Sequence, residues 1–118
     1  MSEQYFLTIT KIVDADTIYG IKSRTFGSLR TTECIIRQKV KVRILGIDAP
    51  EIRGKRKSQK GVEAANYVRE LLPKGESFAY LYSGKKDSFG RELGDVMLPG
   101  ERPLSLHLIS MGYAKEMR

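Results

Sequence analysis

KVKVRILGIDAPE, residues Lys39–Glu51, joins the pattern of a buried strand to a pair of acids. Its first half alternates apolar and cationic residues, which is the period-two pattern of a strand with one buried face. Arg43 is the last cation of this alternation, and Asp48 and Glu51 follow three residues apart where the strand leaves the sheet. A core strand that carries an arginine and ends in two acids indicates a functional site at the end of the strand.

The same stretch belongs to a longer predicted strand over residues 34–47, in which Ile44, Leu45 and Ile47 are expected to be buried and Gly46 marks a bulge or kink. Residues 24–33 are rich in Gly, Ser and Thr and predict a loop or a hairpin extension. Further strands are predicted over residues 6–13, 17–23, 77–83 and 93–98.

Two helices complete the pattern. The first is expected from about Ser58 to Leu72, with its apolar residues at helical spacing, and the second is a short helix between Pro103 and Gly112. The order β-β-β-α-β-β-α favours an α+β, mainly β fold with a five-stranded barrel of the oligonucleotide-binding (OB) type. At 118 residues the chain is expected to form a single domain, 1–118.

The amino-acid composition limits the classes of function that this chain can have. Lys and Arg total 21 against 14 Asp and Glu, a net charge of +7 that favours a polyanionic partner such as nucleic acid. The single Cys34 excludes an intramolecular disulfide. No apolar run is long enough to cross a membrane, and the first residues lack a signal-peptide pattern. We therefore expect a cytoplasmic protein without a membrane partner, or a secreted one if an export signal has been removed.

Four acids are candidates for a metal site. Asp14 and Asp16 flank the first predicted hairpin, and Asp48 and Glu51 end the third strand. If the first and third strands are neighbours, these carboxylates converge, and their mutual repulsion then requires a cation. Oxygen ligands suit Ca²⁺ or Mg²⁺. The alternative is that Asp14 and Asp16 serve only the turn.

Two arginines are candidates for binding phosphate. Arg43 lies within an apolar strand, and Arg91 follows DSFG at the start of another. A guanidinium group matches two phosphate oxygens with parallel hydrogen bonds. Beside a metal and a free carboxylate, two such groups would form a phosphodiester-cleaving site. The alternatives are that Arg43 stands on the solvent face of an edge strand and that Arg91 is an ordinary turn residue.

Four motifs occur in one order: VDADTI at 13–18, VRILGIDAPE at 42–51, DSFGREL at 87–93 and LISMGYAK at 108–115. Together they resemble the staphylococcal nuclease (thermonuclease) family, from about Thr8 to Lys115. The resemblance implies the five-stranded OB barrel and a Ca²⁺-dependent phosphodiesterase acting on DNA and RNA. It also implies attack at phosphorus that leaves a 3′-phosphate and a 5′-hydroxyl.

The resemblance assigns roles to the residues that match its motifs. Asp16, Asp48 and the backbone carbonyl of Ala49 would bind the metal. Glu51 would be the general base or the residue that positions the attacking water. Arg43 and Arg91 would clamp the phosphate.

Other residues are expected to contact nucleic acid or depart from the family. The predicted contacts are Asp87, Phe89 and the basic segment 53–60, with Arg53, Lys55, Arg56, Lys57 and Lys60. Ala15 replaces a glycine that is usual in the family, and a turn that needs a positive φ would strain it. Phe89 replaces a tyrosine and cannot donate a hydrogen bond to phosphate.

Rival functions are a catalytically weak or inactive barrel that binds single-stranded nucleic acid, and an interaction scaffold. A binding module would use strand aromatics such as Tyr80 and Tyr82, although two such neighbours more often share a core face. The acids and arginines favour the enzyme. His107, the single histidine, is expected to be a partly buried helix residue, and a monomer is favoured.

Overall fold

The computed structural model describes residues 3–26, 33–50 and 59–117 of the chain. Five long strands dominate it: β1 (Glu3–Asp14), β2 (Thr17–Phe26), β3 (Glu33–Ile44), β5 (Ser77–Lys86) and β6 (Glu92–Leu98). Three two-residue strands join them: β4 (Ile47–Asp48), β7 (Arg102–Pro103) and β8 (Lys115–Glu116). The helices are α1 (Gln59–Leu71) and α2 (Leu104–Ser110).

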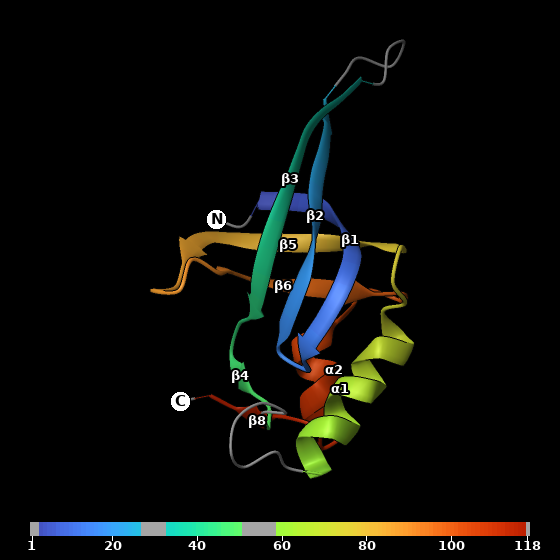
Figure 1. Cartoon of the computed structure of the whole chain (residues 1–118), viewed down its shortest axis with the longest axis vertical. Coiled ribbons are helices and arrows are strands. Elements are labelled where there is room, and N and C mark those ends of the chain that lie inside the picture. Colours follow the sequence, from blue (N-terminus) through green and yellow to red (C-terminus); the bar gives the residue numbers. More distant parts are fainter. Residues whose placement is uncertain (1–2, 27–32, 51–58, 118) are drawn as a thin grey trace.

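The five long strands close into a barrel. They pair antiparallel in the order β3-β2-β1-β5-β6, and β3 then pairs in parallel with β6 at Val42–Ile44. Figure 1 shows β1, β2 and β3 crossing in front of β5 and β6, with both helices at one end of the barrel. This closure confirms the predicted five-stranded fold of the OB type with two helices.

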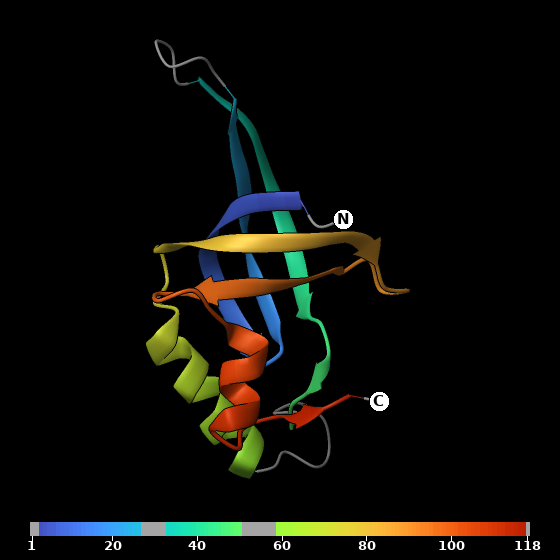
Figure 2. The same cartoon turned by 180° about the vertical axis from the view of Figure 1, so that it is seen from behind.

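Alternation along the strands forms the core. Leu7, Ile9, Ile18, Val42 and Val96 all point inward and are buried. Helix α1 covers the open end with a buried face of small residues and Val68, and Figure 2 shows α2 beside it from the other side of the molecule. No helix among the described residues is long and apolar enough to cross a membrane.

The third predicted strand is wrong at its end. We expected it to run to residue 47 with Leu45 buried, but β3 ends at Ile44 and Leu45 is 41% exposed. Gly46 has φ +77°, a left-handed conformation that ends the strand. After this turn Ile47 and Asp48 form β4, which pairs with β8 near the end of the described chain. The break redirects the chain at the position where the two acids begin.

The hairpin of β2 and β3 extends beyond the barrel (Figure 1). The two strands pair from Thr17 opposite Arg43 to Phe26 opposite Glu33. By contrast β3 contacts β6 only over its last three residues. The part of the prediction that assigned a hairpin extension near residues 24–33 is thus confirmed for residues 24–26 and 33, while residues 27–32 lie outside the described part.

Candidate active site

The turn between β1 and β2 places Asp16 at the end of the barrel. Residues 14–17 are all buried. The backbone carbonyl of Asp16 accepts an N–H from Ile44 at 2.9 Å, which fixes the turn against the end of β3. Its carboxylate accepts the Thr17 hydroxyl at 3.2 Å and the Ala49 N–H at 2.9 Å. Asp16 therefore links the turn between β1 and β2 to residues 44–49, a segment distant in sequence.

Ala15 does not strain this turn. Among the described residues Glu101 is the one non-glycine residue with a positive φ. Ala15 thus has an ordinary backbone conformation, and its methyl group is packed in the core. The substitution of the family's glycine by alanine costs no backbone strain here.

Arg43 lies between two carboxylates. Its Nη1 is 3.4 Å from Oδ2 of Asp16, and its Nη2 is 3.7 Å from Oδ1 of Asp48. Nη1 also donates to the carbonyl of Ile44 at 2.8 Å, which holds the side chain against its own strand. The side chain is 13% exposed, so Arg43 does not share the solvent exposure of Lys39 and Lys41. The guanidinium group of Arg43 is therefore within ion-pair distance of two carboxylates.

Of Asp16, Arg43 and Asp48, Asp48 has the most solvent-exposed side chain. Its side chain is 72% exposed, although its backbone is paired with Lys115 in the β4–β8 ladder. A hollow of about 290 Å³ lies beside it, and its lining includes Ala49, Lys60 and Tyr113. Of the predicted nucleic-acid contacts in the basic segment, Lys60 is therefore next to the candidate site.

Arg91 is held by Asp87 in the turn between β5 and β6. Its Nε donates to Oδ2 of Asp87 at 2.7 Å, and its Nη1 donates to the Thr17 hydroxyl at 3.3 Å. The other Asp87 oxygen accepts the backbone N–H groups of Phe89 and Arg91 at 2.9 and 3.0 Å. Thr17 in turn bonds to Asp16. One chain of hydrogen bonds thus joins Arg91 to the acidic turn.

The electrostatics of Asp87 fit this holding role. Partial desolvation raises the pKa of its carboxyl group, but the hydrogen bonds from Arg91 and Phe89 and the charge of Arg91 outweigh desolvation and lower the pKa below its ordinary value. Asp87 was predicted as a nucleic-acid contact. In the structure its carboxylate is engaged with Arg91 and holds the guanidinium in place, while contact with nucleic acid stays a prediction.

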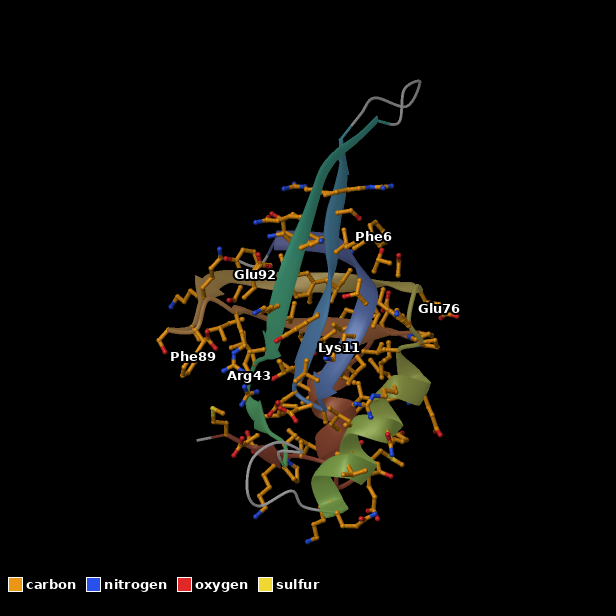
Figure 3. All side chains as sticks on the ribbon, in the orientation of Figure 1. Phe6, Lys11, Arg43, Glu76, Phe89 and Glu92 are labelled. Carbon is orange, nitrogen blue, oxygen red and sulfur yellow. The ribbon has the colours of Figure 1, made fainter. Side chains whose placement is uncertain are left out.

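Phe89 stands out from the surface beside Arg91. Its side chain is 80% exposed, and the Arg91 guanidinium lies 5.6 Å from its ring centroid. Figure 3 shows Phe89 and Arg43 on the same flank of the barrel. An exposed aromatic ring next to a phosphate-binding candidate is a surface on which a base or a sugar can pack.

Several predicted site residues lie outside the described part of the chain: Glu51, Arg53, Lys55, Arg56 and Lys57. The structure brings together Asp16, Arg43, Asp48 and Ala49, and it joins Arg91 to them through Thr17. Sequence reasoning missed Thr17, whose position directly after Asp16 was the one available signal.

Three residues weighed for function have structural surroundings: two belong to or pack against the core, and one lies between the two helices. Tyr80 is fully buried and Tyr82 packs against the core, as expected for strand neighbours that share a face. His107 is half-buried, and its Nε2 lies 2.7 Å from the hydroxyl of Tyr67 on α1. The prediction of a partly buried helix histidine is confirmed.

The donor atoms at this site suit a hard cation. Asp16 and Asp48 bring two carboxylates to one arginine, and oxygen donors are what Ca²⁺ and Mg²⁺ prefer. The described residues contain no group of three or more His, Cys, Asp or Glu that could hold a metal. An ion here would take two carboxylates, and its other ligands would be carbonyl or water oxygens.

Comparison with known proteins identifies relatives. The sequence profile of the family described as staphylococcal nuclease homologue matches residues 41–118. Endonuclease YhcR of Bacillus subtilis (strain 168) is 29% identical over 119 aligned positions, which cover 94% of this chain and 9% of that protein. The chain thus spans about a tenth of the length of this relative.

Proposed function

Because the chain belongs to the staphylococcal nuclease family, we propose that it is a Ca²⁺-dependent phosphodiesterase that hydrolyses DNA or RNA. The observation that carries the proposal is the group at the end of the barrel, where Arg43 is shared by Asp16 and Asp48. Two acids around one guanidinium leave a net negative charge that a divalent cation would neutralise. The name of the relative, an endonuclease, supports the same class of reaction.

Two arginines supply the phosphate-binding groups. Arg43 and Arg91 are both largely buried, and each is held by a carboxylate. Guanidinium groups fixed in this way lose little freedom when they bind a phosphate, and they stabilise the extra negative charge of the transition state. A substrate phosphate competes with Asp16 and Asp48 for Arg43, so substrate and acids share the same cation.

The remaining roles follow from the family. Asp16, Asp48 and the carbonyl of Ala49 would hold the metal, and bound Ca²⁺ would add positive charge beside the phosphate oxygens. Glu51 would take a proton from the attacking water. The new bond joins the water oxygen to phosphorus, the bond to the 5′ oxygen breaks, and that oxygen gains a proton. The products are a 3′-phosphate and a 5′-hydroxyl.

Cleavage of labelled single-stranded DNA and RNA by the purified full chain tests the proposal. Assays contain Ca²⁺, Mg²⁺ or a chelator, and Glu51→Gln is compared with Glu63→Gln, an exposed helix residue. We expect Ca²⁺-dependent cutting that falls by roughly 10²–10⁴-fold in Glu51→Gln and is unchanged in Glu63→Gln. The DNA products should resist extension by a polymerase until a phosphatase has removed the 3′-phosphate.

Two other results would contradict parts of the proposal. Folded wild-type protein that binds oligonucleotides but cuts neither DNA nor RNA with either ion would leave the rival function, a barrel that only binds single strands. Products that a polymerase extends directly would retain the nuclease and overturn the proposed end chemistry.

A further inference from the structure

The outer face of β3 presents a row of cations that leads to Arg43. Arg37, Lys39 and Lys41, here called the cation row, are exposed, and the buried Val40 and Val42 flank Lys41 on the opposite face of the strand. Residues two apart on a strand are about 6.8 Å apart, so the distance from Arg37 to Arg43 is about 20 Å. A repeated positive charge at this spacing is suited to a repeated anion.

In the described part of the chain, the cation row has no acidic partner on its sheet face. Its cross-strand neighbours on β2 are Ser23, Ile21 and Tyr19, opposite Arg37, Lys39 and Lys41 in that order. Within the described residues no carboxylate lies at ion-pair distance from the three cations. Neighbouring like charges without a counter-charge repel one another, and binding an anion removes this repulsion.

A hollow of about 390 Å³ lies beside the row on the same face. Its lining residues are Thr10, Tyr19, Gly20, Ile21, Lys39, Val40 and Lys41. Its volume is in the range of small-ligand pockets. Lys41 stands over the Tyr19 ring, with its Nζ 5.2 Å from the ring centroid. The lining of the hollow therefore combines apolar side chains and an aromatic ring with two lysine ammonium groups.

A further cation lies on β1, next to Thr10 in the lining of the hollow. Lys11 is exposed and pairs in register with Tyr19, so it lies on the same outer face of the sheet. Figure 3 shows Lys11 on the front of β1, on the face that looks toward the viewer. Cations thus stand on both sides of Tyr19.

We propose that this face binds single-stranded nucleic acid and guides it toward Arg43. The cation row would contact successive phosphates, and the hollow at Tyr19 and Ile21 would take an unstacked base. A duplex keeps its bases stacked and paired, so the hollow favours a single strand. The inference rests on the proposed nuclease function for its direction, because the phosphate to be cut would be bound at Arg43. Binding itself can be measured without cleavage.

The lysines of β3 also have a simpler explanation, the protection of an exposed sheet edge. Among the described strands, none pairs with residues 33–41 of β3 on the side away from β2, and lysines on such an edge prevent pairing with another chain. This explanation predicts self-association when the lysines are replaced, with no loss of nucleic-acid binding. The two explanations therefore differ in a measurable way.

The test variant is Lys39→Gln/Lys41→Gln, and the control is Lys74→Gln/Arg102→Gln, which removes the same charge from exposed positions on other elements. The probe is a fluorescent single-stranded oligonucleotide of about 12 nucleotides, a length within the usual range for one OB barrel. Anisotropy is measured at several salt concentrations with a chelator present to prevent cutting.

We expect the test variant to bind roughly tenfold more weakly than the control. The slope of log affinity against log salt should become shallower by about 1.4, since each lost single-strand phosphate contact accounts for about 0.7. Tyr19→Ala should weaken binding by roughly fivefold or more with an unchanged salt slope, because it removes a stacking surface and no charge.

Cleavage separates this proposal from the nuclease assignment. With a dinucleotide substrate, too short to reach the cation row, the test variant should keep the wild-type kcat/KM. With the longer strand its KM should rise while kcat is unchanged. If wild-type protein cuts nothing, the nuclease function fails, and the anisotropy experiment still decides whether the cation row binds.

Three results would overturn the inference. One is equal binding by test and control variants, including the case in which the test variant self-associates. Another is equal competition by polyglutamate or by phosphatidylserine vesicles, which would show a general polyanion or lipid surface. The third is a duplex of the same length that binds more tightly than the single strand.

Discussion

The barrel contains two clusters of charged side chains. One is buried and is here called the sealed cluster; the other reaches solvent and is here called the open cluster. The sealed cluster contains Lys22, Tyr80 and Glu92, all buried. The open cluster contains Asp16, Arg43 and Asp48 and ends in an exposed carboxylate. Both bring a carboxylate and a cation together from segments distant in sequence, yet they differ in charge balance and access to water.

In the sealed cluster, the side chains of Lys22 and Tyr80 both find a partner in the Glu92 carboxylate. Nζ of Lys22 is 2.8 Å from Oε2 of Glu92, and the hydroxyl of Tyr80 donates to Oε1 at 3.0 Å. The ammonium also lies 4.6 and 4.5 Å from the ring centroids of Tyr5 and Tyr82. Burial raises the pKa of Tyr80, and the Glu92 carboxylate raises it further, so the hydroxyl stays protonated and donates.

The open cluster is left with an excess of acid. Two carboxylates share one guanidinium, and the Asp48 side chain remains largely in water. Charges that are balanced and buried are satisfied within the fold and costly to separate, whereas charges that are unbalanced and exposed are available to a ligand. This difference, more than the residue types, distinguishes the candidate site from a structural ion pair.

The largest expected effect is on the sealed cluster. Glu92→Gln leaves the Lys22 ammonium buried without a carboxylate, and we expect the free energy of unfolding to fall by about 3–5 kcal/mol. Urea denaturation measures it, with Glu76→Gln as the exposed control, for which a change within about 0.5 kcal/mol is expected. Combining Glu92→Gln with Lys22→Met should recover most of the loss. A loss that the second substitution does not reduce would contradict the ion-pair explanation.

Asp48→Asn tests the open cluster. Without metal it removes an exposed, 3.7 Å ion pair, so the free energy of unfolding should change by less than about 1 kcal/mol. With Ca²⁺ at 100 times its dissociation constant, binding to the folded state should stabilise the wild type by about 2.7 kcal/mol. The variant should lose most of this increment, while Glu63→Gln keeps it. Equal Ca²⁺ stabilisation in wild type and Asp48→Asn would remove Asp48 from the metal site.

Asp87→Asn examines how Arg91 is positioned. The amide retains one acceptor oxygen but loses the charge that holds the guanidinium, and we expect kcat/KM to fall roughly tenfold, about 1.4 kcal/mol, with the fold intact. Adding Asp87→Asn to Arg91→Gln should produce little further loss, because a positioning residue acts through its partner. Fully additive losses would show that Asp87 acts independently of Arg91.

Local pattern predicted most of the barrel. The strands alternate with period two, and the parity of β2 that buries Ile18 also places Lys22 inward, a signal that was present and overlooked. What local pattern could not predict depends on contacts between distant segments. The β4–β8 pairing joins residues almost seventy positions apart, and the turn at Gly46 that exposes Leu45 leads into it.

The candidate site was predicted in part for the same reason. Motif positions identified Asp16, Arg43, Asp48 and Arg91, but not which acid holds which arginine. The pairing of Arg91 with Asp87 is a local contact between residues four apart in the turn between β5 and β6. The link from Arg91 to Thr17, at the start of β2, instead depends on how segments distant in sequence meet. The roles in metal binding and catalysis, including that of Glu51, remain predictions.

The smallest effect is expected for Asp95. Its burial is intermediate between that of the sealed cluster and that of Asp48 in the open cluster. It is half-buried, it accepts hydrogen bonds from Ser105 and from the Val96 N–H, and within the described residues it has no ion-pair partner. Desolvation raises the pKa of Asp95 above its ordinary value, although these hydrogen bonds lower it. Asp87, which has a cationic partner, shows the opposite shift.

The sign of the pH dependence follows from these shifts. Because the folded pKa of Asp95 lies above the unfolded value, its contribution to stability is fully present below the unfolded pKa and is lost as pH rises through the folded pKa. The stability of wild type relative to Asp95→Asn should therefore decrease over that rise. The corresponding difference for Asp87→Asn should increase, since a lowered pKa stabilises the fold above the unfolded value. Urea denaturation from about pH 3 to 7 measures both differences, and parallel curves for wild type and Asp95→Asn would show that burial of this carboxyl group has no energetic consequence.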